Sequence, residues 1–173
     1  KFCLFAGDLR HVALRPGYIE AQLSLANTLE RDGQSEEALE RYRSVLEKIP
    51  NHVGIINNIG NILKNMGQID EAITHFEKAL ALDPDHVSAY YNLSRARVGS
   101  SPEELARMEK MATDERLNQE QQCSMHFSLG KLYDDLGKYD KAFYHFKRGN
   151  EMDTREKPFD PKLHTIATDR MMA

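Results

Sequence analysis

Three of the six prolines in this chain lie at a constant interval. Pro16, Pro50 and Pro84 are each 34 residues from the next, and the two intervals align without a gap. In this alignment small residues meet small residues, and large apolar residues meet large apolar residues. A fixed internal period of this length is typical of repeat proteins, so it constrains the architecture more than any other feature of the sequence.

Each interval predicts a pair of helices. The first helix is expected from about residue 18 to 31, and Gly33 or Gly67 follows it. Glycine adopts a positive φ without steric cost, and such a residue commonly ends a helix. The second helix begins with acidic residues such as Glu36, which suit the positive end of the helix dipole. It ends before the next proline, which cannot continue it smoothly.

The pattern within each pair resembles the tetratricopeptide repeat. In the first helix the matching elements are a large apolar residue followed by a small one, Leu25-Ala26 and Ile59-Gly60, with a Gly after the helix. In the second helix they are an Ala, Ala38 or Ala72, and an aromatic residue, Tyr42 or Phe76, and the unit ends with Pro. The resemblance implies an all-α fold, in which an α-solenoid of helix-turn-helix repeats winds into a right-handed superhelix.

The period divides the chain into six segments. They are 1–16, a partial and degenerate repeat or an N-terminal cap helix; 17–50, the first repeat; 51–84, the second; 85–122, an interrupted third; 123–156, the fourth; and 157–173, a C-terminal linker or capping helix. Because the chain starts inside a unit without Met and ends without a polar cap, we expect it to be part of a longer protein.

The third segment departs from the repeat pattern. Arg97 occupies a position that is large and apolar in the other units, and the residues after it favour a break in the helix. Ser101, Pro102 and the acidic residues that follow are typical of a helix start. We therefore expect a displaced second helix from Pro102 to Ala112, with another long helix after Asn118.

The composition excludes several classes of protein. Lys and Arg number 23 against 27 for Asp and Glu, so the net charge of −4 argues against a generally basic nucleic-acid binder. No apolar run reaches the roughly 18 residues that a membrane span needs. The chain has two cysteines, too few for a disulfide scaffold, and no visible signal peptide. We expect a cytoplasmic protein, with a monomer favoured.

Motifs for catalysis or metal binding are weak. Gly130-Lys131 resembles the end of a phosphate loop, but Met125 stands where that loop needs Gly. The seven histidines are spread along the chain without a cluster in sequence. Cys123 and His126 could form a nucleophile and a base, but no orienting third group is evident. The sequence therefore predicts no enzyme, no cofactor and no metal site in this chain.

By analogy to the tetratricopeptide family, the first helix of each unit lines a concave groove that binds peptides. The inward positions selected as a candidate peptide site are Asn27, Asn57, Asn58, Asn61, Lys64, Tyr91, Asn92, Arg95, Phe127 and Lys131. Asparagine is a poor helix residue, so its abundance needs a reason. Its amides could bind a peptide backbone, with the cations attracting acidic groups; alternatively, they bond the neighbouring repeat and only stabilise the stack.

One known mode of the family does not fit this sequence. Members that bind heat-shock chaperones hold a terminal carboxylate between asparagines and cations. Asn27 and Asn58 match the asparagines, but Leu23, Ser88 and Asn92 stand where the cations should be. A carboxylate would lack its charge partners there, which argues against a co-chaperone.

The C-terminal half shows a narrower resemblance. The runs from His126 to Lys131 and from Asp134 to Asp140, together with Phe159-Asp160-Pro161, look like bacterial proteins in which such repeats precede a sulfotransferase domain. The resemblance implies that a sulfotransferase domain follows Ala173. The favoured hypothesis is a protein-protein interaction module that binds a peptide or partner protein; the alternative is a structural scaffold that spaces or oligomerises a larger protein.

Overall fold

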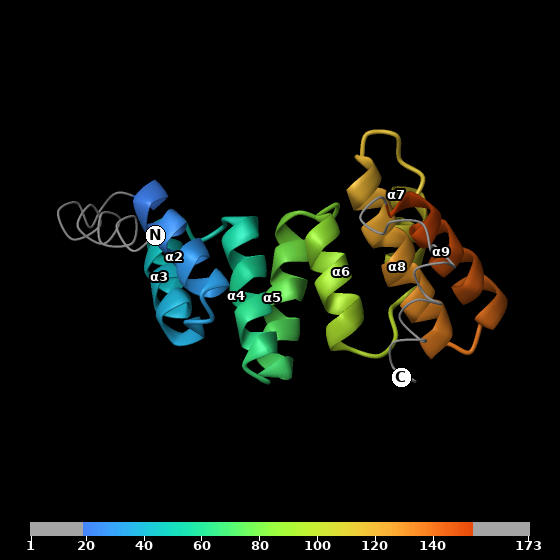
Figure 1. Cartoon of the computed structure of the whole chain (residues 1–173). Coiled ribbons are helices and arrows are strands. Elements are labelled where there is room, and N and C mark those ends of the chain that lie inside the picture. The colour runs from blue at the N-terminus through green and yellow to red at the C-terminus, as the bar shows by residue number, and fades with distance from the viewer. Residues whose placement is uncertain (1–18, 154–173) are drawn as a thin grey trace, which may run out of the picture.

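The computed structural model describes residues 19–153, and these residues form helices and no strand. Figure 1 shows the helices side by side along one extended body. Their bounds are α2 Ile19–Arg31, α3 Ser35–Lys48, α4 Val53–Asn65, α5 Ile69–Leu82, α6 Val87–Ala96, α7 Pro102–Met111, α8 Gln119–Asp135 and α9 Tyr139–Met152. The predicted all-α fold, a solenoid of helical pairs, is confirmed.

Three pairs form regular hairpins: α2 packs on α3, α4 on α5, and α8 on α9. The turns between the paired helices contain Gly33, Gly67 and Gly137, with φ of 77°, 81° and 69°. Only glycine adopts this left-handed conformation without strain, so the turn glycines expected at Gly33 and Gly67 are confirmed.

Within a hairpin the two helices meet where a small residue faces an aromatic ring. A Cβ added to Gly60 would lie 2.6 Å from Cε1 of Phe76, and one added to Gly130 would lie 2.7 Å from Cδ1 of Phe146. Phe76 is fully buried. The ring therefore sits directly against the backbone of the first helix, and this contact sets the spacing of the pair.

The third unit is built differently. Its first helix, α6, ends at Ala96, and Arg97 turns out of the helix to pair with Glu77 at 2.7 Å and with Glu104 at 2.5 Å. Helix α7 packs on α8 rather than on α6, and α6 contacts α8 directly. An apolar residue at position 97 would have extended the core; the arginine instead links α5, α6 and α7 through charge.

Both helices that follow the interruption begin with a capping box. The Ser101 hydroxyl accepts from the backbone N–H of Glu104, while the Glu104 carboxylate accepts from that of Ser101. Asn118 and Gln121 make the same reciprocal pair at the start of α8. Such a box satisfies backbone groups that a helix end leaves unpaired. The predicted helix starts at Pro102 and after Asn118 are therefore confirmed.

The apolar core has two main clusters that meet at α6. Leu93 joins the cluster formed by α2 to α5, whereas Val87 and Tyr90 join the cluster of α7, α8 and α9. Met108 and Met111 of α7 and Met125 of α8 are buried in the second cluster. Helix α6 thus connects the regular repeats to the C-terminal hairpin despite the missing partner helix.

The predicted division of the chain into six segments stays a prediction. Helix α8 begins at Gln119, so it crosses the boundary expected between segments 85–122 and 123–156. The expected segments 1–16 and 157–173 lie outside the described residues.

The close contact at Gly60 predicts a specific stability defect. Gly60→Ala should lower the free energy of unfolding by about 1–3 kcal/mol, because the added methyl group meets a buried ring that has no room to move. The matched control is Gly54→Ala in the same helix, where the added Cβ would lie 3.4 Å from a side-chain atom of His52. Urea denaturation followed by circular dichroism measures both variants, and equal stabilities would contradict the packing assignment.

Candidate functional site

The candidate site lies on the surface formed by the first helices of the units, α2, α4, α6 and α8, here called the groove face. Consecutive members contact each other, as α4 does with α6 and α6 with α8. Helical spacing places Asn57, Asn61 and Lys64 of α4 on one side of that helix. The polar residues that the sequence analysis selected are therefore brought onto neighbouring helices.

The hydroxyl of Tyr42 organises the N-terminal part of the groove face. It lies 2.5 Å from the amide oxygen of Asn27 and 3.1 Å from Oε2 of Glu30, and it accepts a hydrogen bond of 3.2 Å from Nδ2 of Asn58. Nδ2 of Asn61 donates to Oε1 of Glu30 at 3.1 Å. We call these five residues the Tyr42 network; it links the first repeat to α4.

Burial and charge together favour the neutral form of this tyrosine. Burial raises the pKa of Tyr42 to about 12, with the nearby Glu30 carboxylate adding to the effect. The phenol therefore stays protonated and can donate to Asn27 at any physiological pH.

A second set of bonds links α4 to α6. Nδ2 of Asn92 donates to the amide oxygen of Asn57 at 3.2 Å, and Nζ of Lys64 lies 3.5 Å from the amide oxygen of Asn92. Both asparagines are buried. The amide pair is fixed in one orientation because each member bonds the other helix.

The remaining candidate residues differ in their surroundings. The guanidinium of Arg95 lies 5.4 Å from the centre of the Tyr91 ring, one helical turn earlier in α6. Lys131 forms an ion pair of 2.5 Å with Asp135. The ring of Phe127 packs against Gly149 of α9, so it contributes to the hairpin contact.

These bonds bear on the two interpretations of the asparagines. All five selected asparagines, Asn27, Asn57, Asn58, Asn61 and Asn92, use a side-chain group to bond another helix. Stabilising the stack is therefore one role that the geometry gives them. Binding of a peptide by the same amides stays a prediction.

The structure brings together two histidines that are 19 residues apart in the sequence and that the sequence analysis did not pair. Nδ1 of His126 lies 3.0 Å from Nδ1 of His145, between α8 and α9, and both rings are buried. Tyr133 stacks on His145 with its ring centre 5.5 Å away. The only sequence signal was that His126 aligns with buried Ile56 in the repeat pattern.

The surroundings of the pair disfavour protonation. Burial lowers the pKa of His145 to about 4, and the neighbouring His126 contributes to the shift; Glu109 opposes it and Lys141 reinforces it. Burial also lowers the pKa of His126, and the positive charge of Arg148 lowers it further. The pair therefore shares a hydrogen bond between two neutral rings at neutral pH.

The thiol of Cys123 bonds the backbone of α9. It donates to the carbonyl oxygen of Gly149 at 3.3 Å, while His126 bonds His145. Among residues 19–153, no group of three or more metal-ligating side chains comes together. No helix in that range is long and apolar enough to cross a membrane.

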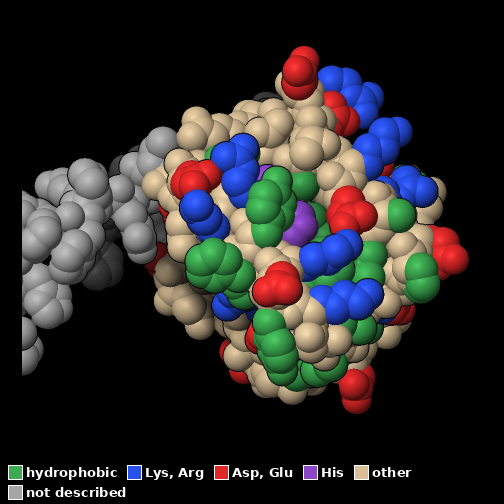
Figure 2. Space-filling model, turned by 90° about the vertical axis from the view of Figure 1, so that its right-hand side faces the viewer, with side chains coloured by type: hydrophobic (Ala, Val, Ile, Leu, Met, Phe, Trp, Pro, Cys, Tyr) green, Lys and Arg blue, Asp and Glu red, His purple; other side chains and the backbone are tan. Residues whose placement is uncertain are grey.

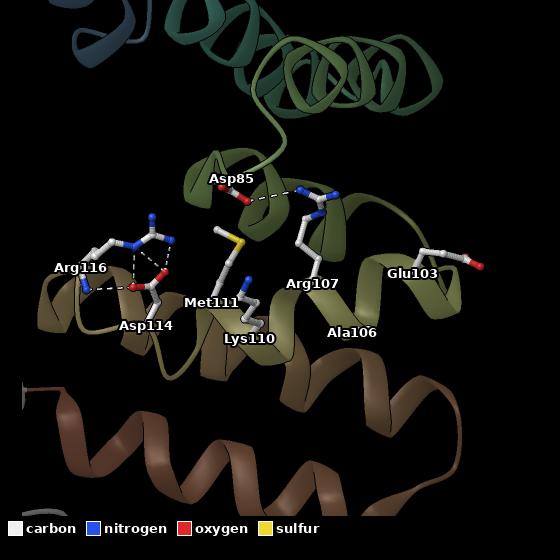
Figure 3. Close-up of a pocket in the computed structure, with 8 residues that line it drawn as sticks. All are labelled: Asp85, Glu103, Ala106, Arg107, Lys110, Met111, Asp114 and Arg116. Carbon is white, nitrogen blue, oxygen red and sulfur yellow. Dashed lines mark hydrogen bonds and ion pairs between the residues drawn. The ribbon is translucent and has the colours of Figure 1, made fainter.

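A separate pocket of about 380 Å³ lies beside the displaced helix α7. Figure 3 shows the side chains that line it, including two ion-paired arginines: Arg107 with Asp85 at 3.4 Å and Arg116 with Asp114 at 2.5 Å. Lys110 and Glu103 complete a balanced set of charges. Because the cations are largely matched by carboxylates, this pocket offers less for a charged ligand than the groove face does.

Comparison with known proteins agrees with this geometry. Models of the tetratricopeptide repeat match residues 22–53, 60–96 and 124–154. The chain carries tetratricopeptide repeats. No curated protein matches the sequence.

Solved structures with tetratricopeptide repeats share the fold at low sequence identity. The crystal structure of MamA is 20% identical with a TM-score of 0.65, and the match covers 87% of each chain. YrrB, described as a tetratricopeptide-repeat protein with an unusual peptide-binding site, is 22% identical with a TM-score of 0.63; the match covers 84% of this chain and 74% of YrrB. At these identities the likeness establishes the fold.

The Tyr42 network predicts that one hydroxyl group has a measurable effect on stability. Tyr42→Phe should lower the free energy of unfolding by about 1–2 kcal/mol, because it removes the donor to Asn27 and the acceptor for Asn58. Tyr91→Phe is the matched control, since the Tyr91 hydroxyl makes no hydrogen bond within residues 19–153. Equal effects of the two changes in thermal or urea denaturation would contradict the network.

The buried histidine pair predicts a loss of stability in acid. The folded-state pKa of His145 lies below the ordinary value of 6.5, so the unfolded chain binds the proton more readily and stability falls as the pH drops from 6.5 towards 4. The loss should be on the order of 3 kcal/mol. Urea denaturation at pH 7.5 and at pH 4.5 measures it.

The variant His145→Gln isolates this effect from other titrating groups. Its stability at pH 7.5 gives the packing cost of the substitution. The carboxylates of the chain titrate in both proteins, so their effect cancels when the two are compared at each pH. The difference in stability between wild type and variant should therefore shrink in acid. A difference that is the same at both pH values would show that the pair does not resist protonation.

Proposed function

We propose that this chain is a protein-protein interaction module that holds an extended peptide, or an extended segment of a partner protein, on its groove face. The tetratricopeptide fold supports the proposal, because helical solenoids of this kind present long surfaces suited to extended ligands. The peptide-binding site described for YrrB, a protein of the same fold, supports it as well.

The observation that carries the proposal is the state of the asparagine amides. Each amide in the Tyr42 network uses one group to hold the stack: the oxygen of Asn27 and the nitrogens of Asn58 and Asn61. The other group of each amide has no hydrogen-bond partner within residues 19–153. The network thus orients one donor and two acceptors, which match the needs of a peptide backbone. Stacking and binding are compatible roles for the same side chains.

The wider setting of the module is part of the proposal. The resemblance of the C-terminal half to sulfotransferase-associated repeats supports placing these repeats in the N-terminal region of a sulfotransferase-like protein. The repeats would then have the binding role, and any catalysis would lie elsewhere. The proposed location is the cytoplasm, as expected from the sequence. A reading frame after Ala173 that encodes a phosphosulfate-binding loop would support this placement, and an unrelated frame would remove it.

The groove assignment can be tested with a substitution that leaves the stack bonded. Asn27→Asp retains an oxygen that accepts from Tyr42, but it converts the outward donor into an acceptor. Peptides selected by the chain from a random decapeptide display library should bind this variant about tenfold more weakly, since an acceptor would face the peptide carbonyl group. Fluorescence anisotropy with labelled selected peptides measures the affinity.

The matched control makes the same change of an amide to a carboxylate away from the groove face. Gln68 is exposed in the turn before α5 and makes no side-chain cap bond, so Gln68→Glu should leave the affinity unchanged. If the library yields no binder, or if Asn27→Asp binds as tightly as Gln68→Glu, the groove is not the binding site.

One observation favours the alternative of an assembly scaffold. Helix α9 exposes Tyr139, Phe143 and Tyr144 by 69%, 70% and 55%. Figure 2 shows hydrophobic side chains mixed with charged ones on this end of the body. A second copy of the chain is the partner that this alternative requires. Light scattering that detects a dimer, lost in Phe143→Ser, would support it over the favoured monomer.

A further inference from the structure

Two cations of the groove face, Lys64 and Arg95, both lie beside Asn92, and the charge of Arg95 affects the pKa of Lys64. Lys64 of α4 reaches Asn92 of α6 at 3.5 Å, and Arg95 lies three residues after Asn92, on the same side of α6. Neither cation forms an ion pair within residues 19–153, whereas Lys131 on the same face is neutralised by Asp135. The structure therefore separates the three groove cations that the sequence treated alike.

Both side chains are held in place by neutral groups. The amide pair Asn57–Asn92 is fixed between α4 and α6, and it supplies the oxygen that receives the Lys64 ammonium group. The guanidinium of Arg95 lies over the Tyr91 ring at 5.4 Å, and none of its N–H groups bonds another described residue. An ammonium group has three donors and a guanidinium has five, so most donors of the pair are unused.

In the unliganded protein, Lys64 and Arg95 repel each other electrostatically. Partial burial lowers the pKa of Lys64, and the positive charge of Arg95 lowers it further. A bound anion between the two cations would remove their mutual repulsion and accept charge-assisted hydrogen bonds. The site is thus arranged to gain more from an anion than an isolated surface lysine would.

We propose that Lys64 and Arg95 together bind a carboxylate of the peptide that occupies the groove face, so that the module selects acidic ligands. This inference rests on the proposed function, because it assumes that a peptide lies on the groove face. The amides of the Tyr42 network would then hold the backbone at one end of the groove, while the cation pair recognises a side chain or a chain terminus nearer its middle.

Four synthetic decapeptide pools test the proposal. They carry randomised flanks with either Glu or Gln at the central position, and each is made with an amidated and with a free C-terminus. Binding to the chain is measured by competition in fluorescence anisotropy. The amidated Glu pool should bind about tenfold more tightly than the amidated Gln pool, which lacks any carboxylate at that position. If the free-acid Gln pool binds as tightly as the amidated Glu pool, the pair recognises the terminal carboxylate.

Variants assign the preference to the two residues. Arg95→Gln changes an exposed side chain, and Lys64→Met retains the aliphatic stem without the charge; each should bring the two amidated pools to within about twofold of each other. Lys131→Gln is the matched control from the same face and should retain the full preference. The preference of the wild type should also weaken in 0.5 M NaCl.

The outcomes separate the two proposals. If no pool binds, the groove-face function itself fails. If all pools bind wild type equally, the function stands but the cation pair does not recognise a carboxylate. If Arg95→Gln and Lys64→Met retain the preference while Lys131→Gln loses it, the recognition lies elsewhere on the groove face and the assignment is overturned.

Discussion

The contact between an aromatic ring and a small residue within each hairpin is the constraint on which the rest of the structure depends. Phe76 rests on Gly60, and Phe146 rests on Gly130, because no Cβ separates ring and backbone. Ala26 and Tyr42 occupy the same repeat positions in the first unit. There the ring carries a hydroxyl, which reaches Asn27, Glu30 and Asn58. The packing contact of the core therefore also delivers the polar group that organises the groove face.

The interruption in the third unit changes the stack but leaves the groove face continuous. Arg97 cannot be buried without charge partners, so it leaves the helix and pairs with Glu77 and Glu104. Burial alone would raise the pKa of Glu104, but hydrogen bonds from Ser100, Ser101 and Arg97 lower it, which keeps the carboxylate charged. Helix α7 moves onto α8, and α6 meets α8 directly. The first helices thus remain neighbours along the whole described body.

Under the proposed function, polar side chains on the groove face would combine stabilisation of the stack with binding of a ligand. An amide has separate donor and acceptor groups, so it can bond a neighbouring repeat with one and a ligand with the other. Such an arrangement restricts the amide before a ligand arrives, which lowers the entropy cost of binding. The same logic applies to Arg95, which is exposed and whose guanidinium group lies over the Tyr91 ring. In this proposal, the same hydrogen bonds that stiffen the stack also orient the groups that would bind a ligand.

The sequence by itself determined the architecture, because the 34-residue interval between prolines, the turn glycines and the paired small and aromatic residues are local and periodic signals. It also indicated the break after Arg97, since a charged residue at an apolar position cannot continue the pattern. Only the tertiary structure decided which groove residues are engaged. The bond between Asn61 and Glu30 spans 31 positions of the sequence, and the bond between Asn92 and Asn57 spans 35. The pairing of His126 with His145 is likewise set by the packing of α8 on α9, which residue type and repeat position do not specify. The ion pair of Lys131 with Asp135 is different, because residues four apart on one helix are neighbours by helix geometry alone.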